Sequence, residues 1–383
     1  MKIKLRHTSF SKALIYTSKA INTKPNIPIL ANVLLETTKD SIRLAATNLD
    51  MGINIWLPGT TEVTGKTTVN GKYISDFVSA INSENVELSL EDNNLIVKTS
   101  RSNASFAVMS AAEFPVLPKL IGEPIFKIDR KEFIESMDKV LFSCSTDLSA
   151  GRIQQSGVLF DISSENVDKI SFIGLDGFRL SKRESKVTDL SKNITKEEVI
   201  VPARYLSELS KILSDYSDVD ELEVFLSESG SQIIFKFDDI EFSIRLLEGP
   251  YPDYRRIMPD SSSFTFEVKK SDFEDAIKVV NSFAKGNLGN RTLFDFDIEN
   301  SKVTLTSTVA EVGEGKTEFL ISSADGESDL NTAFTLRYLG DLVNHIKGQD
   351  IVFESKGPLA ASVYKDKSDP HFVHLIMPMR RDT

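Results

Sequence analysis

The chain has 383 residues, of which 40% are hydrophobic and 26% charged, and its formal net charge is −11. This composition is globular and excludes a disordered, collagen-like or coiled-coil chain, and at roughly 100 to 200 residues per domain the length predicts two to four domains. A net charge of −11 argues against nucleic-acid binding unless positive charge gathers locally. The single cysteine, Cys144, excludes an intrachain disulfide and fits a reducing compartment.

The N-terminal residues 1–20 contain polar and charged side chains such as Arg6, His7 and Lys12, so they lack the apolar core of a signal peptide. No run approaches the roughly 20 apolar residues that cross a bilayer. We therefore expect a soluble, cytoplasmic protein with no membrane partner.

A helix is predicted near the N-terminus, because apolar or small residues stand at positions i, i+3, i+4 and i+7, which share one helix face. The same pattern recurs twice later in the chain. The three copies are Phe10, Ala13, Leu14 and Thr17; Phe133, Ser136, Met137 and Val140; and Phe273, Ala276, Ile277 and Val280.

A second helix also occurs three times, and each copy begins with a basic residue followed by a tyrosine. These tyrosines, at positions 73, 205 and 338, stand 132 and 133 residues apart. The copies are Tyr73, Ile74, Phe77, Val78 and Ile81; Tyr205, Leu206, Leu209, Ser210 and Leu213; and Tyr338, Leu339, Leu342, Val343 and Ile346. Three matches at nearly constant spacing indicate an internal repeat.

Short alternating runs such as 86–90, 95–98, 233–237 and 302–305 predict half-exposed antiparallel strands. The repeated unit is therefore α+β, with two helices packed on antiparallel sheets. Proline-marked stretches at 117–119 and 258–260 separate three predicted units, which cover 1–121, 122–259 and 260–383.

Positive charge is predicted to gather near the helices. Six segments that hold them (2–21, 71–82, 127–143, 203–214, 267–285 and 335–347) sum to +7, which leaves −18 for the rest of the chain. This distribution favours helices that face a polyanion, although the good helix propensity of lysine is an alternative explanation. Most of the excess comes from residues 2–21.

These repeats resemble the bacterial replicative sliding clamp, the family of the beta subunit of DNA polymerase III holoenzyme. The resemblance covers the whole chain. Its specific motifs are Pro25-x-x-Pro28-Ile29-Leu30, Leu175-Asp176-Gly177-Phe178-Arg179-Leu180, Tyr251-Pro252-Asp253-Tyr254-Arg255-Arg256 and Met377-Pro378-Met379-Arg380.

The resemblance implies a processivity factor of DNA replication, a non-catalytic subunit without a cofactor or metal. Two chains would join head to tail into a six-unit ring around duplex DNA, with helices inside. Twelve helices about 9 Å apart form a circle about 35 Å across, which leaves a hole of about 25 Å for the duplex. Basic side chains there would contact phosphates without reading bases. The candidates are Lys24, Lys72, Arg204 and Arg337, each of which also fits an ordinary surface charge.

The resemblance also implies a groove between the second and third units, which binds short peptides of the replicative polymerase and the clamp loader. Carried over by motif, its residues are Arg152, Leu175, Gly177, Phe178, Arg179, Leu180, Tyr251, Pro252, Arg256, Ile257, Tyr338, Leu359, Leu375, Met377, Pro378 and Met379. Leu175 and Phe178 replace the small polar residue and the histidine that are common in the family. We therefore expect a more apolar groove with a shifted peptide preference.

For the ring to close, the resemblance implies that Phe106 and Val108 of one chain contact Val279 and Val280 of the other. From the residues alone, the same side chains fit the core of their own unit equally well.

Three further motifs resemble sites of other chemistry. Residues 310–317 nearly match a phosphate-binding loop, but they lack the first glycine and precede a predicted strand instead of a helix. His371 and His374 would point to opposite faces of a strand, so a metal site is not expected. Asp176 is predicted to organise a turn.

Two other classes of function stay open at this point. A nuclease or nucleotidyltransferase would use Asp50 and Asp176 with Mg²⁺, and turnover by the purified chain would indicate it. A monomeric peptide-binding scaffold would share the groove but form no ring.

Overall fold

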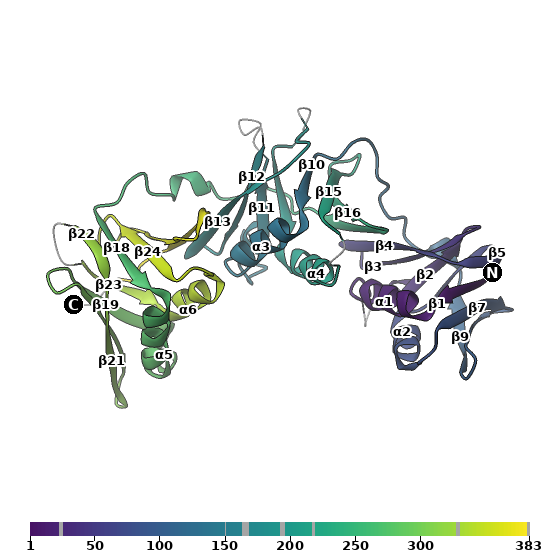
Figure 1. Ribbon diagram of the computed structural model, residues 1–383, viewed down its shortest axis with the longest axis horizontal. Helices are drawn as coiled ribbons and strands as arrows, with labels where there is room; N and C mark the ends of the chain where they lie inside the picture. Colours follow the sequence, from purple (N-terminus) through teal and green to yellow (C-terminus); the bar gives the residue numbers. More distant parts are fainter. Residues whose placement is uncertain are drawn as a thin grey trace. The chain divides into compact units, whose positions relative to one another are not determined.

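The computed structural model describes residues 1–22, 26–149, 151–162, 168–191, 196–216, 219–326 and 330–380 (Figure 1). These residues form two compact units. The first holds Met1–Lys131, Val187–Lys196 and Arg204–Leu246, and the second holds Glu132–Lys186, Glu197–Ala203 and Leu247–Thr383. The predicted boundaries at 121 and 259 stay a prediction.

The first unit contains the helices α1 (His7–Ser18) and α2 (Gly71–Ala80) and nearly all of α4 (Ala203–Ser214). Helix α1 lies beside α2 and contacts the sheet over β3 and β4. The strands of this unit are β1 (Lys2–Arg6), β2 (Asn32–Thr37), β3 (Ser41–Thr47), β4 (Met51–Pro58), β5 (Thr60–Val63), β6 (Gly65–Asn70), β7 (Asn85–Glu91), β8 (Asn94–Lys98), β9 (Asn103–Met109), β10 (Phe126–Asp129), β15 (Glu221–Leu226), β16 (Gln232–Phe237) and β17 (Ile240–Arg245).

These thirteen strands form one sheet in the order β10-β15-β16-β17-β4-β3-β2-β6-β9-β8-β7-β1-β5. Its pairs are antiparallel, as predicted. The pairing of β4 with β17, in which Ile53 stands opposite Phe242, joins strands of the first and second predicted repeats.

The second unit contains most of α3 (Arg130–Leu141) and the whole of α5 (Lys270–Gly286) and α6 (Leu336–His345). Its nine-stranded sheet has the order β14-β11-β12-β13-β26-β25-β24-β18-β22, and its four-stranded sheet has the order β21-β20-β19-β23. These strands are β11 (Gly157–Asp161), β12 (Lys169–Leu175), β13 (Arg179–Lys186), β14 (Glu198–Pro202), β18 (Phe264–Lys269), β19 (Arg291–Asp297), β20 (Lys302–Val309), β21 (Gly313–Leu320), β22 (Ser322–Gly326), β23 (Leu330–Thr335), β24 (Asp350–Ser355), β25 (Ser362–Asp366) and β26 (Asp369–Ile376).

The predicted helix faces are confirmed by burial. In α1, α3 and α5, all twelve repeated positions are buried; they run from Phe10 to Thr17, from Phe133 to Val140 and from Phe273 to Val280. In the second kind of helix the tyrosines differ, because Tyr205 is buried while Tyr73 is 66% exposed.

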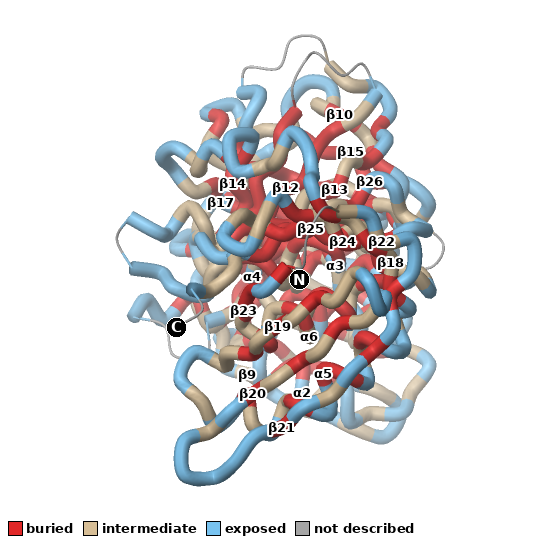
Figure 2. Tube along the Cα trace, turned by 90° about the vertical axis from the view of Figure 1, so that its left-hand side faces the viewer, coloured by how far each residue is buried: buried red, intermediate tan, exposed pale blue. Residues whose placement is uncertain are grey.

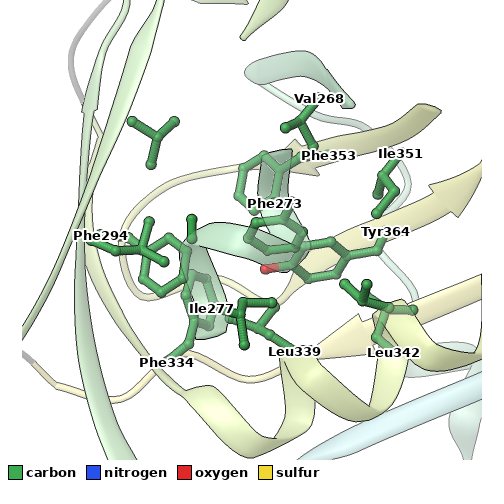
Figure 3. Close-up of a cluster of buried hydrophobic side chains, with 14 of the residues drawn as sticks. Val268, Phe273, Ile277, Phe294, Phe334, Leu339, Leu342, Ile351, Phe353 and Tyr364 are labelled. Carbon is green, nitrogen blue, oxygen red and sulfur yellow. The ribbon is translucent and has the colours of Figure 1, made fainter. Parts of the chain in front are cut away.

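The core of the second unit gathers side chains from α5, α6 and both of its sheets (Figure 3). Phe273 and Ile277 of α5 and Leu339 of α6 point toward Phe353 and Tyr364 of the strands. Val280 belongs to the same cluster and is fully buried. Its predicted role in a chain-to-chain contact is therefore wrong, because its helix face is already covered by its own unit.

The predicted gathering of charge on the helices needs a correction. Lys2, Lys4 and Arg6 lie on β1, where they alternate with the buried Ile3 and Leu5, and only Lys12 of this segment lies within α1. Because Ile3 and Leu5 point toward the core beneath α1, the three cations point to the other face of the sheet. Most of the positive charge in residues 2–21 therefore lies on β1 and not on α1.

The near match to a phosphate-binding loop lies at the end of the hairpin of β20 and β21, and no helix follows it. Figure 2 shows exposed segments at chain turns and buried positions concentrated along the strands and helices. Among the described residues, no helix is both long and apolar enough to cross a membrane.

Candidate functional site

A tight turn joins β12 to β13 and presents an aromatic side chain. Oδ1 of Asp176 accepts hydrogen bonds from the backbone N–H groups of Phe178 and Arg179, both at 3.0 Å. Gly177 has a φ of +89°, a left-handed conformation that favours glycine. Asp176 thus organises the turn, as predicted, and Phe178 is left 54% exposed.

Arg179 ties this turn to α6. Its Nε donates to Oδ2 of Asp176 at 3.0 Å, and its Nη1 donates to Oδ2 of Asp341 at 2.6 Å. Its guanidinium carbon also lies 4.5 Å from the ring centroid of Tyr338, whose ring stacks at 6.5 Å on that of Phe178. The guanidinium of Arg179, which two carboxylates hold in place, therefore packs against Tyr338, and Tyr338 stacks on Phe178.

An apolar floor lies under the turn. Four predicted groove residues, Leu175, Leu180, Tyr251 and Leu375, lie in one cluster. The hydroxyl of Tyr251 donates to the carbonyl of Ile173 at 3.2 Å, and burial raises the pKa of Tyr251 well above its ordinary value. The sequence interpretation missed further members of this cluster, which come from other strands and loops: Leu159, Ile173, Ile200, Leu247, Tyr254, Met258, Ala361, Val363 and Val373.

The chain end after β26 runs beside the turn. The N–H of Met377 donates to the carbonyl of Phe178 at 2.8 Å, and the N–H of Met379 donates to the carbonyl of Ala333 at 2.7 Å. The hydroxyl of Thr335 lies 3.5 Å from the sulfur of Met379. Pro378 lies between these two anchored residues, so the predicted 377–379 segment is held at both ends.

Four exposed members of the predicted set are large and apolar, whereas Arg152 and Arg256 are exposed and charged. Phe178, Leu359, Met377 and Ile257 have exposed fractions of 54%, 66%, 41% and 41%. We call the surface formed by Phe178, Tyr338, Met377 and Met379 over the cluster of Leu175, Leu180 and Leu375 the tail patch. Among the described residues, Arg152, Pro252, Arg256 and Leu359 are not members of the cluster beneath it. Arg152 pairs with Asp147 at 3.9 Å, and Arg256 pairs with Asp253 at 2.9 Å.

Two titratable groups near the tail patch, Cys144 and His374, are kept in their neutral forms. Burial raises the pKa of the Cys144 thiol to about 12, so it is no nucleophile at neutral pH. Burial, the charge of Arg179 and the neighbouring His345 lower the pKa of His374 well below its ordinary value. His371 is exposed, so the two histidines lie on opposite faces of β26, as predicted.

Carboxylates considered for metal-dependent catalysis have structural partners. Asp50 accepts a hydrogen bond from the hydroxyl of Tyr205 and forms an ion pair with Arg204, both at 3.1 Å. Asp176 is committed to its own turn and to Arg179. Within the described ranges, no group of three or more His, Cys, Asp or Glu side chains is placed to hold a metal ion.

The predicted DNA contacts differ from one another. Lys24 lies outside the described residues. Lys72 of α2 and Arg337 of α6 are exposed, and neither forms an ion pair with a described residue. Arg204 of α4 is partly neutralised, because it pairs with Asp50 and stacks at 4.3 Å on the ring of Tyr205.

The predicted chain-to-chain contacts lie at partly open surfaces, apart from Val280. Phe106 of β9 meets the ring of Phe77 of α2 edge-on, with centroids 5.7 Å apart, and Val108 stands opposite Val69 in β6. Both Phe106 and Val108 are half-buried. Val279 of α5 is 53% exposed.

Three family models match the chain in succession. They describe the N-terminal, central and C-terminal domains of the DNA polymerase III beta subunit, and they match residues 1–118, 127–253 and 255–380. A beta sliding clamp of Staphylococcus epidermidis is 26% identical over 389 aligned positions, covering 99% of both chains, and one of Staphylococcus aureus is 25% identical with the same coverage.

Solved structures show the same fold. The DNA polymerase sliding clamp of Bacillus subtilis has a TM-score of 0.91 at 22% identity and covers 100% of both chains. The DNA polymerase III beta subunit of Caulobacter crescentus has a TM-score of 0.90 at 24% identity, again over 100% of both chains.

Proposed function

Because the chain belongs to the DNA polymerase III beta subunit family, we propose that it is a processivity clamp of DNA replication, which has no catalytic role of its own. The observation that carries this conclusion is the succession of three family domains over 1–118, 127–253 and 255–380. A replication clamp acts where the chromosome is copied, which in a bacterium is the cytoplasm.

The clamp acts as a homodimeric ring that encircles duplex DNA. The three helix pairs found in each chain supply twelve helices to such a ring, enough for a hole of about 25 Å. In this proposal Lys72 and Arg337 contact phosphates and read no bases, so that the ring slides. Arg204 contributes less, because Asp50 already balances its charge.

Ring closure is proposed to bring Phe106 and Val108 of one chain against Val279 of the next. The support is that each keeps part of its apolar surface open while its neighbours fix its position. Phe77 holds the ring of Phe106, and the fully buried Val280 holds the helix that presents Val279.

Partner proteins are proposed to bind the tail patch through short apolar peptide segments, and the replicative polymerase and the clamp loader are the expected partners. Phe178 and Met377 offer exposed apolar surface over a closely packed floor, and methionine adapts its shape to different ligands. The remaining predicted residues, Arg152, Gly177, Arg179, Tyr251, Pro252, Arg256, Ile257, Leu359, Leu375 and Pro378, are proposed to frame this site.

Light scattering and a turnover assay test this proposal together. A ring requires a particle of twice the chain mass of 42.6 kDa at micromolar concentration, together with no cleavage or nucleotide incorporation in the presence of Mg²⁺. A particle of single-chain mass would indicate a monomeric scaffold. Turnover that is lost in Asp50→Ala and Asp176→Ala would indicate an enzyme.

A further inference from the structure

A cleft with a volume of about 640 Å³ lies in the first unit, where β1, the segment between α2 and β7, and the turn between β8 and β9 meet. Its charged side chains are Lys4, Lys98, Arg101, Glu84 and Glu87, and asparagine, serine and threonine residues line the rest together with Val86. We call this surface the basic cleft.

The register of the sheet places these charges next to one another. Lys4 of β1 stands opposite Glu87 of β7, which in turn stands opposite Lys98 of β8. Side chains directly opposite on one face lie about 5 Å apart at Cβ. Arg6 stands opposite Asn85 in the same way and extends the positive row.

Four cations in and beside the basic cleft form no ion pairs with described residues. Lys4, Arg6, Lys98 and Arg101 are exposed, and none of them forms an ion pair with any residue in the described ranges. Lys2 approaches Glu87 at 3.6 Å and therefore takes up part of that negative charge. Among the described lining carboxylates, Glu84 forms no ion pair. The lining thus holds three cations against two carboxylates, a net charge of +1, on a chain whose net charge is −11.

We propose that the basic cleft binds an acidic segment of a partner protein, separately from the tail patch. Aspartate and glutamate side chains of such a segment would pair with Lys4, Lys98 and Arg101, and its backbone N–H groups would meet Glu84 and the polar side chains. The volume of the cleft accommodates several residues of an extended peptide.

Nucleic acid fits the cleft less well. Its described lining contains no aromatic side chain on which a base would stack. The cations also lie on the sheet face opposite to α1, whereas a duplex encircled by the proposed ring would lie on the helix side.

The test uses the full-length protein and a short fluorescein-labelled oligo-glutamate peptide, with binding followed by anisotropy at low ionic strength. The triple variant Lys4→Gln, Lys98→Gln and Arg101→Gln is expected to weaken binding roughly tenfold or more, and added salt is expected to weaken wild-type binding. The matched control is Lys39→Gln, Lys66→Gln and Lys119→Gln, which removes the same charge from exposed lysines of the same unit. The control is expected to bind like the wild type.

Four results would overturn the proposal. The first is that the wild type does not bind oligo-glutamate, and the second is that the matched control loses as much affinity as the triple variant. The third is that the wild type prefers a labelled oligothymidylate of similar length and that the triple variant loses this binding. The fourth is that light scattering gives the triple variant half the particle mass of the wild type. The last result would assign the cleft to a second copy of the chain. The first three results leave the dimer mass, the tail patch and the ring unaffected, and the fourth concerns only the variant while the wild type stays dimeric, so failure here is distinguishable from failure of the proposed function.

Discussion

The ammonium of Lys139 lies 3.3 Å from Oδ2 of Asp366, and both side chains are fully buried. Lys139 belongs to α3 and Asp366 to β25, 227 positions apart. Burial raises the pKa of Asp366, but hydrogen bonds from Ser368 and Gly348 and the charge of Lys139 outweigh it and lower the pKa to about 2. The pair therefore fixes α3 against the nine-stranded sheet within the second unit.

Removing one partner of this pair is expected to be costly. Lys139→Met leaves the carboxylate of Asp366 buried without its cation, which lowers the free energy of unfolding by about 3–5 kcal/mol. Lys139→Met with Asp366→Leu is expected to recover part of that loss, because no unpaired charge remains. Urea unfolding of both variants measures this, with the exposed Lys131→Met as control. A single variant as stable as the control would show that the pair contributes nothing to stability.

Peptide binding is expected to depend on the exposed side chains of the tail patch. Phe178→Ala and Met377→Ala should each weaken the binding of a partner peptide by about 1–3 kcal/mol, since each removes apolar contact surface without opening the core. Deletion of residues 377–383 should abolish binding and leave the particle mass unchanged. Calorimetric titration measures this, with Val116→Ala, a valine that is 91% exposed in the first unit, as control. Unchanged affinity in the deletion variant would refute the assignment.

Asp176→Ala distinguishes a structural carboxylate from a catalytic one. We expect it to weaken peptide binding, because Phe178 and Arg179 lose the acceptor that shapes their turn. Crystal or NMR data on the variant should show the turn displaced. Peptide affinity equal to that of the wild type would contradict this role.

DNA contacts should differ among the three described candidates. Lys72→Ala and Arg337→Ala should each reduce the slope of log affinity against log salt concentration by about 1, because each removes one phosphate contact. Arg204→Ala should change it less, since Asp50 already neutralises part of its charge. Fluorescence titrations with duplex DNA over a range of salt concentrations measure the slopes. A larger effect of Arg204→Ala than of Lys72→Ala would reverse the order that the structure predicts.

Local pattern was sufficient for much of the fold. The 3.6-residue period identified the faces of α1, α3 and α5, because burial of a helix follows from its own sequence. The strand–helix junction at His7 was not visible, since no proline or glycine separates β1 from α1, and three strand cations were assigned to a helix as a result. The pairing of β4 with β17 was also missed, because strand register across distant segments is set by tertiary packing.

Local sequence pattern also identified only part of each candidate site. Motif residues such as Leu175, Leu180 and Leu375 do lie together, but their neighbours Val363 and Met258 carry no local signal. The partner of Arg204, Asp50, stands 154 positions away. Val280 was misassigned because the helical period predicts which positions are buried but not whether the covering surface belongs to the same chain.

Retention on circular DNA tests the central claim most directly. The protein is loaded on nicked circular DNA with a clamp loader, and the circle is then cut at one site. A sliding ring stays on the closed circle and is lost from the open ends after cutting, but it is kept when both ends are blocked. Retention on unblocked linear DNA would contradict the clamp account.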